Sequence, residues 1–314
     1  MAEVELNRSV ITPTSELLKV RLVNLAPIVL LGMALSWAYW SSLKALSELW
    51  SNDPNYSHGW FVIPIALVIA WSRRDLIDPA QIRPRWWGVL PLIAVLTLRY
   101  VLFEWNEQYL ETATIPFVVM SAALAIGGWN LLRVIWPAAI FVFLMLPLPP
   151  SLNGTLASPL QTVATAGSLS LLQACGMPVL AEGNVIIVGS ERLEVARACN
   201  GLSMLLSFVT LITAMVILIR RPIWERIVLL LSTVPIAIIS NILRIAVTAW
   251  CYQQFGHELG EKYAHDWAGY LLMPVALVFV LLELKLMSWL IVEVDQPPEG
   301  IIFASPGMPQ TDLS

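Results

Sequence analysis

The chain has 314 residues, of which 58% are hydrophobic and only 13% are charged, and it contains fourteen tryptophans. Charge this sparse cannot cover the surface of a soluble protein of that size, so we expect the lipid bilayer to be the solvent. The formal net charge of −4 leaves no basic footprint of the kind that binds nucleic acids.

Apolar runs divide the chain into segments long enough, or nearly so, to cross a membrane, which requires about 20 residues. We predict eight spans, the second of them short, at 25–46, 59–72, 86–103, 112–128, 132–150, 201–219, 227–250 and 267–288. Residues 1–24 are too acidic for the start of a signal peptide, so we expect a cytoplasmic segment followed by a retained first helix. Residues 291–314 form a short Pro-rich tail that we expect to be cytoplasmic and disordered.

The charged joints between these runs alternate in character. Basic residues follow the second, fourth and sixth runs, and they are Arg73, Arg74, Arg83, Arg85, Arg133, Arg220, Arg221 and Arg226. Because loops rich in Lys and Arg stay in the cytoplasm, these joints predict the cytoplasmic side. The joints after the first, third and fifth runs are acidic or mixed, and we place them outside.

The segment between the fifth and sixth spans has a different pattern. Residues 155–180 carry no charge, but their apolar side chains share one helical face and polar ones occupy much of the rest, which is typical of a helix in or re-entering the interface. A true span here would also invert the downstream chain and place its arginines outside. Residues 183–196 contain two β-branched runs around Gly189-Ser190, which predict an external β-hairpin rather than an unstructured loop. The predicted fold is therefore an all-α polytopic membrane protein with an external interfacial helix and β-hairpin before the sixth of about eight transmembrane helices.

This topology brings three reactive side chains to the outer face. Cys199 precedes the sixth span, Arg244 lies in the seventh, and His265 precedes the eighth. Arg244 sits roughly 9 Å below the end of its span, given the helical rise per residue. An arginine at that depth is costly and by default a functional candidate, although snorkelling to the interface is the alternative. Ser240, Asn241, Arg244 and Thr248 recur at helical spacing, so we expect this polar stripe to face protein or a wet cavity rather than lipid.

Cys199 is the candidate nucleophile of this group. It stands between the predicted hairpin and a helix N-terminus, where helical amides favour an anion and lower a thiol pKa. A lone cysteine in a membrane protein is otherwise more often a small packing residue. His265 can act as general base and then as acid near neutral pH, or can be a surface residue beside the aromatic belt of Trp267 and Tyr270. His257-Glu258-Leu259-Gly260-Glu261 lacks the second histidine of a zinc-protease helix, so we expect no metal and no cofactor.

Several motifs together resemble the exosortase/archaeosortase family. They are Ala198-Cys199-Asn200-Gly201, Asn241-Ile242-Leu243-Arg244, His265 with Gly269, Tyr56-Ser57-His58-Gly59 and Leu146-Pro147-Leu148-Pro149. The resemblance covers nearly the whole chain from about 30 to 290, and the ordered Cys, Arg and His on an eight-helix plan make it specific. Many members have Ser after the cysteine, where this chain has Asn200.

The resemblance implies an intramembrane cysteine transpeptidase, with residues 25–290 as its catalytic domain in the bacterial inner membrane and its active site facing the periplasm. Substrates would be exported proteins with a C-terminal tail of short motif, transmembrane helix and basic cluster, the motif typically being Pro-Glu-Pro. Cys199 would be the nucleophile, Arg244 would stabilise the oxyanion or thiolate, and His265 would move protons. Supporting residues would be Asn200, Asn241, His58, Tyr56 and Arg197, and the other partners would be membrane lipids and a cell-envelope acceptor, or water in its place.

Other interpretations remain open at this stage. A transporter with an anion site at Arg244 predicts inverted repeats and matched broken helices, which the sequence does not show. A scaffold subunit of an envelope assembly system would use Arg244 only structurally. Arg192, Arg197 or Lys262 are candidates to bind an acidic motif residue. Cys175 and Cys251 are either a disulfide pair, as an oxidising outer compartment would allow, or two buried small residues.

Overall fold

The structure is a computed structural model, and it describes residues 29–78, 81–188, 191–194, 201–219, 221–259 and 266–290. The described chain is mainly helical, with one small sheet before the last three helices. The N-terminal part comprises a helix Val29–Ala38, α2 (Trp40–Asn52), η1 (Pro54–Tyr56), α3 (Gly59–Ser72), η2 (Arg74–Leu76), η4 (Trp86–Gly88), α4 (Val89–Glu104), α5 (Gln108–Thr112), α6 (Ile115–Phe141) and η5 (Val142–Met145). The C-terminal part comprises α7 (Pro150–Ala174), β1 (Val179–Glu182), β2 (Val185–Val188), β3 (Glu191–Glu194), α8 (Leu202–Leu218), α9 (Ile223–Leu259) and α10 (Asp266–Leu290).

The helices coincide with the apolar runs of the sequence. Three described segments are long and apolar enough to cross a membrane: Trp86–Glu104, Gln108–Met145 and Ile223–Gly256. Val29–Ala38 and Leu202–Leu218 are shorter apolar helices. Large apolar side chains are exposed along the bundle, as the 85% exposure of Trp37 illustrates, and such a surface suits lipid rather than water. The chain is a membrane protein, and the count of eight spans stays a prediction.

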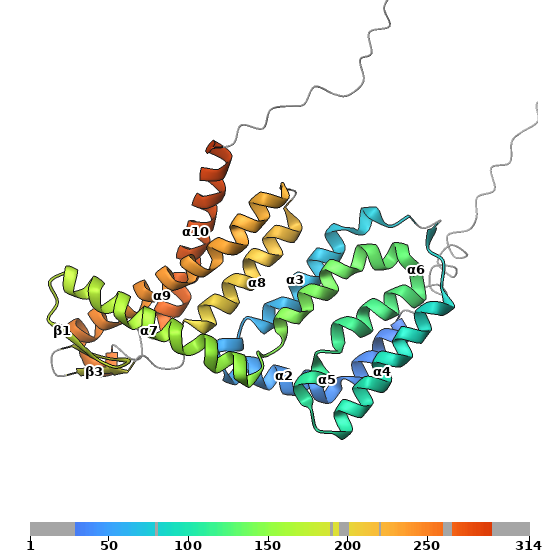
Figure 1. Cartoon of the computed structure of the whole chain (residues 1–314), viewed down its shortest axis with the longest axis horizontal. Coiled ribbons are helices and arrows are strands. Elements are labelled where there is room, and N and C mark those ends of the chain that lie inside the picture. Colours follow the sequence, from blue (N-terminus) through green and yellow to red (C-terminus); the bar gives the residue numbers. More distant parts are fainter. Residues whose placement is uncertain are drawn as a thin grey trace, which may run out of the picture.

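The chain reverses direction within α6. Gly128 has φ +67°, a left-handed conformation that glycine adopts without steric cost. The limbs before and after it match the predicted runs 112–128 and 132–150, and Figure 1 shows the chain turning back at this point. The reversal, the end of α3 and the turn between α8 and α9 lie toward one side of the bundle, whereas α5 and the first turn of α7 lie toward the other. This arrangement agrees with the alternation of basic and acidic joints in the sequence.

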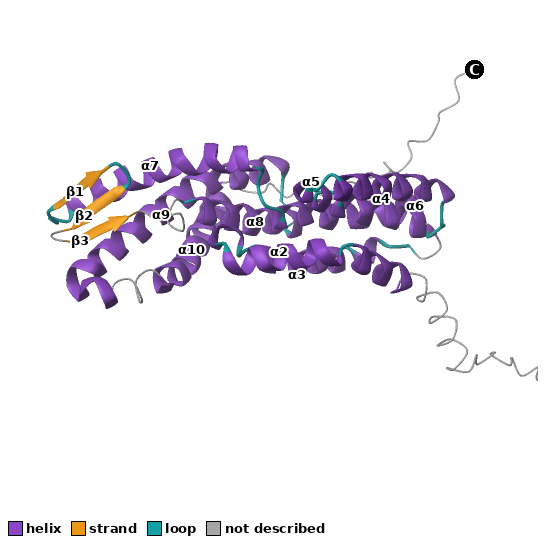
Figure 2. Cartoon of the chain, turned by 90° about the horizontal axis from the view of Figure 1, so that it is seen from below, coloured by secondary structure: helices purple, strands orange, loops and turns teal. Residues whose placement is uncertain are grey.

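The predicted β-hairpin is present as two strands of a three-stranded antiparallel sheet. β2 pairs with β3 from Val185 opposite Glu194 to Val188 opposite Glu191. The sequence analysis missed β1, which pairs with β2 through Val179 opposite Val188. Buried Ile186 and Val188 pack with residues of α7 and α9, so the sheet covers the ends of these two helices at one end of the molecule (Figure 2).

Helix α7 crosses α9 instead of running beside it (Figure 1). It has 25 residues, but it does not reach the hydropathy of the described candidate spans. Thr165 and Ser168 of α7 are buried against protein, whereas Thr155, Ser158, Thr162 and Ser170 are exposed, as are the apolar residues Leu156 and Val163. An interfacial position of α7 therefore stays a prediction, and the buried side of the helix carries apolar as well as small polar residues.

Neither of the two cysteines in the described ranges is oxidised. Cys175 and Cys251 are both free thiols. The disulfide alternative for this pair is therefore wrong in this structure. The segments 1–24 and 291–314, for which we expected cytoplasmic locations, lie outside the described residues.

Candidate active site

The polar stripe on α9 is buried against protein. Ser240, Asn241, Arg244 and Thr248 are 0%, 0%, 8% and 4% exposed. Their spacing places them along one face of the helix, and the same face continues into the buried apolar residues Ile245 and Ala249. The prediction that this stripe avoids lipid is confirmed.

Helix α7 approaches α9 closely at Ile242 because it presents small residues there. A Cβ atom on Gly167 would lie only 2.4 Å from Cδ1 of Ile242, so the helices meet where α7 has no side chain. The next residue, Ser168, donates its hydroxyl hydrogen to the carbonyl oxygen of Ile242 at 3.2 Å. Small residues permit such an approach in membrane proteins, and the hydroxyl then bonds across the interface. α7 therefore packs on α9 at Ile242, the residue that follows Asn241 in the chain.

The start of α8 joins the same place. Gly201, the N-cap of α8, has φ +85° and is buried. A Cβ atom added to it would meet Nδ2 of Asn241 at 3.1 Å and Cβ of Leu160 at 3.7 Å. The residue that opens α8 is therefore seated between α7 and the polar stripe. A side chain here would be strained by its backbone conformation and crowded by Asn241.

A second polar arrangement, which we call the loop cluster, consists of Trp50, Tyr56 and His58 on the turn 144–148. The Tyr56 hydroxyl accepts hydrogen bonds from the backbone N–H of Leu148 and from Nδ2 of Asn153, both at 3.3 Å. Nε2 of His58 lies 3.1 Å from the carbonyl oxygen of Leu144. Trp50 donates its indole N–H to the carbonyl oxygen of Met145 at 3.0 Å. Two motifs that are distant in sequence, around Tyr56 and around Leu146, are in direct contact.

Burial controls the protonation of both titratable groups in the loop cluster. Burial lowers the pKa of His58, while backbone hydrogen bonds with Leu144 and Asn55 oppose part of that effect. Burial likewise raises the pKa of Tyr56, and its hydrogen bond with Leu148 opposes the change. Both groups are therefore held neutral and engaged in contacts with the 144–153 segment. This geometry favours the supporting role that we predicted for them.

Helix α8 separates the two arrangements. η1, which contains Tyr56, contacts α8, and α8 also contacts α9. Leu206 of α8 packs on the core around Tyr56, whereas Met204 and Phe208 pack with Ala237 of α9. The loop cluster and the polar stripe thus lie against different faces of one helix. Because α8 contacts both the loop cluster and the polar stripe, a shift of one can move the other through this helix.

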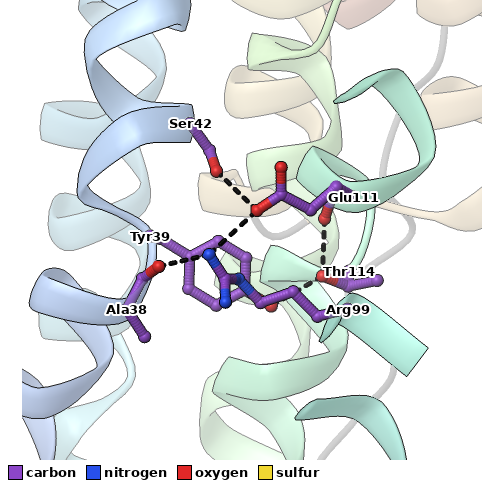
Figure 3. A network of polar contacts seen from close by, with 6 residues as sticks. All are labelled: Ala38, Tyr39, Ser42, Arg99, Glu111 and Thr114. Carbon is purple, nitrogen blue, oxygen red and sulfur yellow. Dashed lines mark hydrogen bonds and ion pairs between the residues drawn. The ribbon is translucent and has the colours of Figure 1, made fainter. Parts of the chain in front are cut away.

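The sequence patterns did not predict a third polar network. Arg99 of α4 forms an ion pair with Glu111 at 3.0 Å, and Ser42 donates to the same carboxylate oxygen at 2.8 Å (Figure 3). The Arg99 guanidinium also lies 4.6 Å from the ring centroid of Tyr39 and donates to the carbonyl oxygen of Ala38. A charged residue inside an apolar run was the available signal, the same one that marked Arg244. The network joins the first helical segments to α4 and α5.

Four of the predicted site residues, namely Arg197, Cys199, Asn200 and His265, lie outside the described residues. Their chain neighbours Gly201 and Asp266 are described, and Asp266 opens α10, which packs against α9. Arg192 of β3, a candidate for binding an acidic motif, already pairs with Glu182 of β1. Within the described ranges, no three His, Cys, Asp or Glu side chains gather as a metal site would require.

The polar stripe has a definite chemical capacity. A guanidinium and an amide held at low exposure keep their hydrogen-bond donors in a region of low dielectric, where an anion is stabilised more strongly than in water. Arg244 and Asn241 are therefore suited to a thiolate or a developing oxyanion.

Comparison with known proteins gives one match. Residues 50–282 match the family model described as transmembrane exosortase (Exosortase_EpsH). No curated protein and no solved structure matches the chain. The matched range includes the loop cluster, the polar stripe and both Cys199 and His265.

Proposed function

The chain belongs to the transmembrane exosortase family, and we propose that it is a membrane-embedded cysteine peptidase and transpeptidase. Its substrates are exported proteins with a C-terminal tail of short motif, transmembrane helix and basic cluster. The enzyme sits in the bacterial inner membrane with its active site toward the periplasm. It cleaves the tail and transfers the remaining protein to an acceptor in the cell envelope.

One observation carries this proposal. Gly201 packs against Asn241, one helical turn from Arg244. Two peptide units span at most about 7 Å, so covalent continuity keeps the backbone of Cys199 close to Gly201 and to the polar stripe. A cysteine that is two residues from the contact of Gly201 with the polar stripe supports a nucleophilic role for Cys199. The N-terminus of α8 adds a favourable dipole for a thiolate.

The reaction has two acyl-transfer steps. In the first, the Cys199 thiolate attacks the scissile carbonyl carbon, and Arg244 stabilises the oxyanion that forms. The C–N bond then breaks, a thioester remains on Cys199, and His265 supplies the proton that the leaving amine requires. In the second step, His265 takes a proton from the acceptor amine, hydroxyl or water. That acceptor attacks the thioester and releases the Cys199 thiolate.

The test uses a secreted reporter that ends in a Pro-Glu-Pro motif, an apolar helix and an arginine cluster, expressed together with the enzyme. We expect wild-type enzyme to convert the reporter to a shorter form, and Cys199→Ala to leave the full-length reporter in the membrane. Immunoblotting of both ends of the reporter measures the conversion.

Matched controls are available in the same chain. Cys175→Ala and Cys251→Ala remove the other two thiols, both free, and should leave processing unchanged. Processing by the Cys199→Ala variant at the wild-type rate would refute the nucleophile assignment. An added small nucleophile such as hydroxylamine should capture the thioester and yield a hydroxamate at the cleaved end of the reporter, which mass spectrometry detects.

The competing functions make a different prediction for the thiol. A transporter with Arg244 at an anion site, or a structural subunit of an envelope assembly system, does not require a reactive Cys199. A membrane-impermeant alkylating reagent should therefore abolish processing in the double variant Cys175→Ala/Cys251→Ala. If the chain were instead a transporter or a structural subunit, the same reagent should leave its transport or assembly function unchanged.

A further inference from the structure

A pocket lined by three arginines lies away from the proposed active site. It is formed by the connection between α3 and α4 and by the reversal within α6, and its volume is about 310 Å³. The residues that line it are Gln81, Arg83, Arg85, Gly127, Gly128, Trp129, Asn130 and Arg133. We name it the arginine pocket. Its size is at the lower end of ligand sites and suits a head group rather than a whole lipid.

The backbone fixes the shape of the arginine pocket. The N–H of Arg85 donates to the carbonyl oxygen of Ala125 at 3.1 Å. The carbonyl oxygen of Arg83 would lie 2.8 Å from a Cβ atom on Gly128, so the two segments touch there. Asn130 closes one edge through hydrogen bonds from Nδ2 to the carbonyl oxygen of Gln81 at 3.0 Å and to its Oε1 at 3.1 Å. The pocket is preformed by these contacts.

The charge of the arginine pocket is uncompensated within the described residues. Among these residues, none of the guanidinium groups of Arg83, Arg85 and Arg133 forms an ion pair with a carboxylate. The nearby acids have other contacts, since Asp75 pairs with Arg74 and Asp78 accepts a hydrogen bond from Gln81. Three like charges around one concavity repel each other and attract an anion. Guanidinium groups bind phosphate oxygens in paired hydrogen bonds, so phosphate is the chemistry that fits.

Exposed tryptophans around the pocket indicate the source of that phosphate. Trp86, Trp87 and Trp129 are 89%, 76% and 56% exposed. Tryptophans with this exposure at a helix end are typical of the head-group level of a bilayer. α4, an apolar candidate span, begins at this level. We propose that the arginine pocket binds the phosphate of an anionic phospholipid, held by Arg83, Arg85 and Arg133.

This site is separate from the proposed catalytic one. The 14-residue helix α3 lies between His58 of the loop cluster and the arginine pocket and separates these two by about 20 Å. α4 and α6 also lie at the end of the molecule opposite the sheet (Figure 2). The lipid is therefore an anchor that sets the depth and orientation of the bundle, because basic pockets near the membrane surface hold anionic head groups. It does not depend on the proposed peptidase reaction.

The experiment compares lipids added to the purified full-length protein in detergent. We expect dioleoylphosphatidylglycerol to raise the thermal unfolding midpoint more than dioleoylphosphatidylcholine does, and native mass spectrometry to retain the anionic lipid. The double variant Arg83→Gln/Arg133→Gln should weaken apparent affinity for the anionic lipid by at least tenfold. Arg133→Lys, which keeps the charge but loses the planar fork, should give an intermediate loss.

The control Arg74→Gln/Arg226→Gln removes the same charge from outside the pocket and should bind like wild type. The single variants Arg83→Gln and Arg133→Gln replace exposed side chains, so they test the proposal even where the double variant does not fold. The proposal would be overturned if the two lipids raised the unfolding midpoint equally. It would also be overturned if the control variant lost as much affinity for the anionic lipid as the double variant Arg83→Gln/Arg133→Gln. Inorganic phosphate alone giving the same stabilisation would overturn the lipid source and assign a soluble anion instead.

Discussion

Two arginines inside apolar helices have different environments in the two parts of the molecule. Arg99 in the N-terminal part is matched by Glu111, and its other contacts, with Ala38 and the Tyr39 ring, come from the preceding helical segments. Arg244 in the C-terminal part belongs to a stripe whose other members, Ser240, Asn241 and Thr248, are neutral. The first arrangement places a counter-charge beside the arginine, whereas the second places the arginine on a helix face that Gly201, two residues from Cys199 in the chain, contacts.

This difference separates a structural arginine from a candidate catalytic one. A buried ion pair holds helices together, and it offers little to a substrate because its charges are already compensated. Arg244 lies on the helix face that Gly201 contacts, so its charge is placed near the point where an anion forms in the proposed reaction. Burial alone does not distinguish the two, since the Arg99 side chain is 15% exposed and Arg244 as a residue 8%. The position of each arginine relative to the proposed reaction decides the role that we assign to it.

The largest expected effect follows from breaking the pair in the N-terminal part. Glu111→Ala leaves the Arg99 charge without its carboxylate and should lower the free energy of unfolding by about 3–5 kcal/mol. The double variant Arg99→Met/Glu111→Leu removes both charges and should recover most of this loss. Chemical unfolding in detergent measures both variants. A loss below about 1 kcal/mol for Glu111→Ala would mean that the network does not hold α4 and α5 in place.

The matching change in the C-terminal part should affect activity instead of stability. Arg244→Gln keeps a polar side chain of similar length but removes the charge, and reporter processing should fall about 100-fold, as for loss of one oxyanion donor. The unfolding midpoint should change little. Processing rates and thermal unfolding of the same preparation separate these effects. Equal proportional losses of activity and folded protein would give Arg244 the structural role of Arg99.

The sequence predicted where the helices lie because apolar periodicity is a local property. The run 59–72 coincides with α3, and the spacing of Ser240, Asn241, Arg244 and Thr248 predicted a buried face. β1 escaped prediction because a four-residue strand without alternation has little local signal and forms only by pairing with β2.

Contacts between distant segments could not be predicted from local patterns. The Arg99–Glu111 pair joins α4 to α5. The residues next to either of them in the sequence do not indicate which partner it has. The docking of Tyr56 and His58 on the 144–148 turn spans about 90 positions, as the sequence separations of 92 and 86 show. The resemblance quoted both motifs, but only the fold shows that they touch.

An intermediate effect is expected at the contact between α7 and the stripe helix. Gly167→Ala places a Cβ atom 2.4 Å from Cδ1 of Ile242, so Ile242 must move and the cost should be about 1–3 kcal/mol. Gly154→Ala on the same helix has nothing within 4 Å and should stabilise slightly through helix propensity. Unfolding free energies measure the difference between the two alanines.

A compensating change tests whether this cost is steric. Gly167→Ala/Ile242→Ala removes the atoms that clash, and it should destabilise less than the sum of the two single variants. Strict additivity would show that the close approach of α7 to α9 does not limit packing near the polar stripe.

The smallest effect concerns the loop cluster and pH. Burial lowers the pKa of His58 in the folded protein below its value in the unfolded chain. The unfolded chain therefore takes up the proton first as pH falls, and stability is complete above the unfolded pKa near 6.5 and declines below it. One proton limits the slope to about 1.4 kcal/mol per pH unit. Unfolding free energies at pH 7.5 and 5.5 should differ in this direction for wild type, and the difference should shrink in His58→Gln. If the pH dependence were unchanged in His58→Gln, it would belong to other groups. The protonation of His58 would then not affect stability through its contact with Leu144.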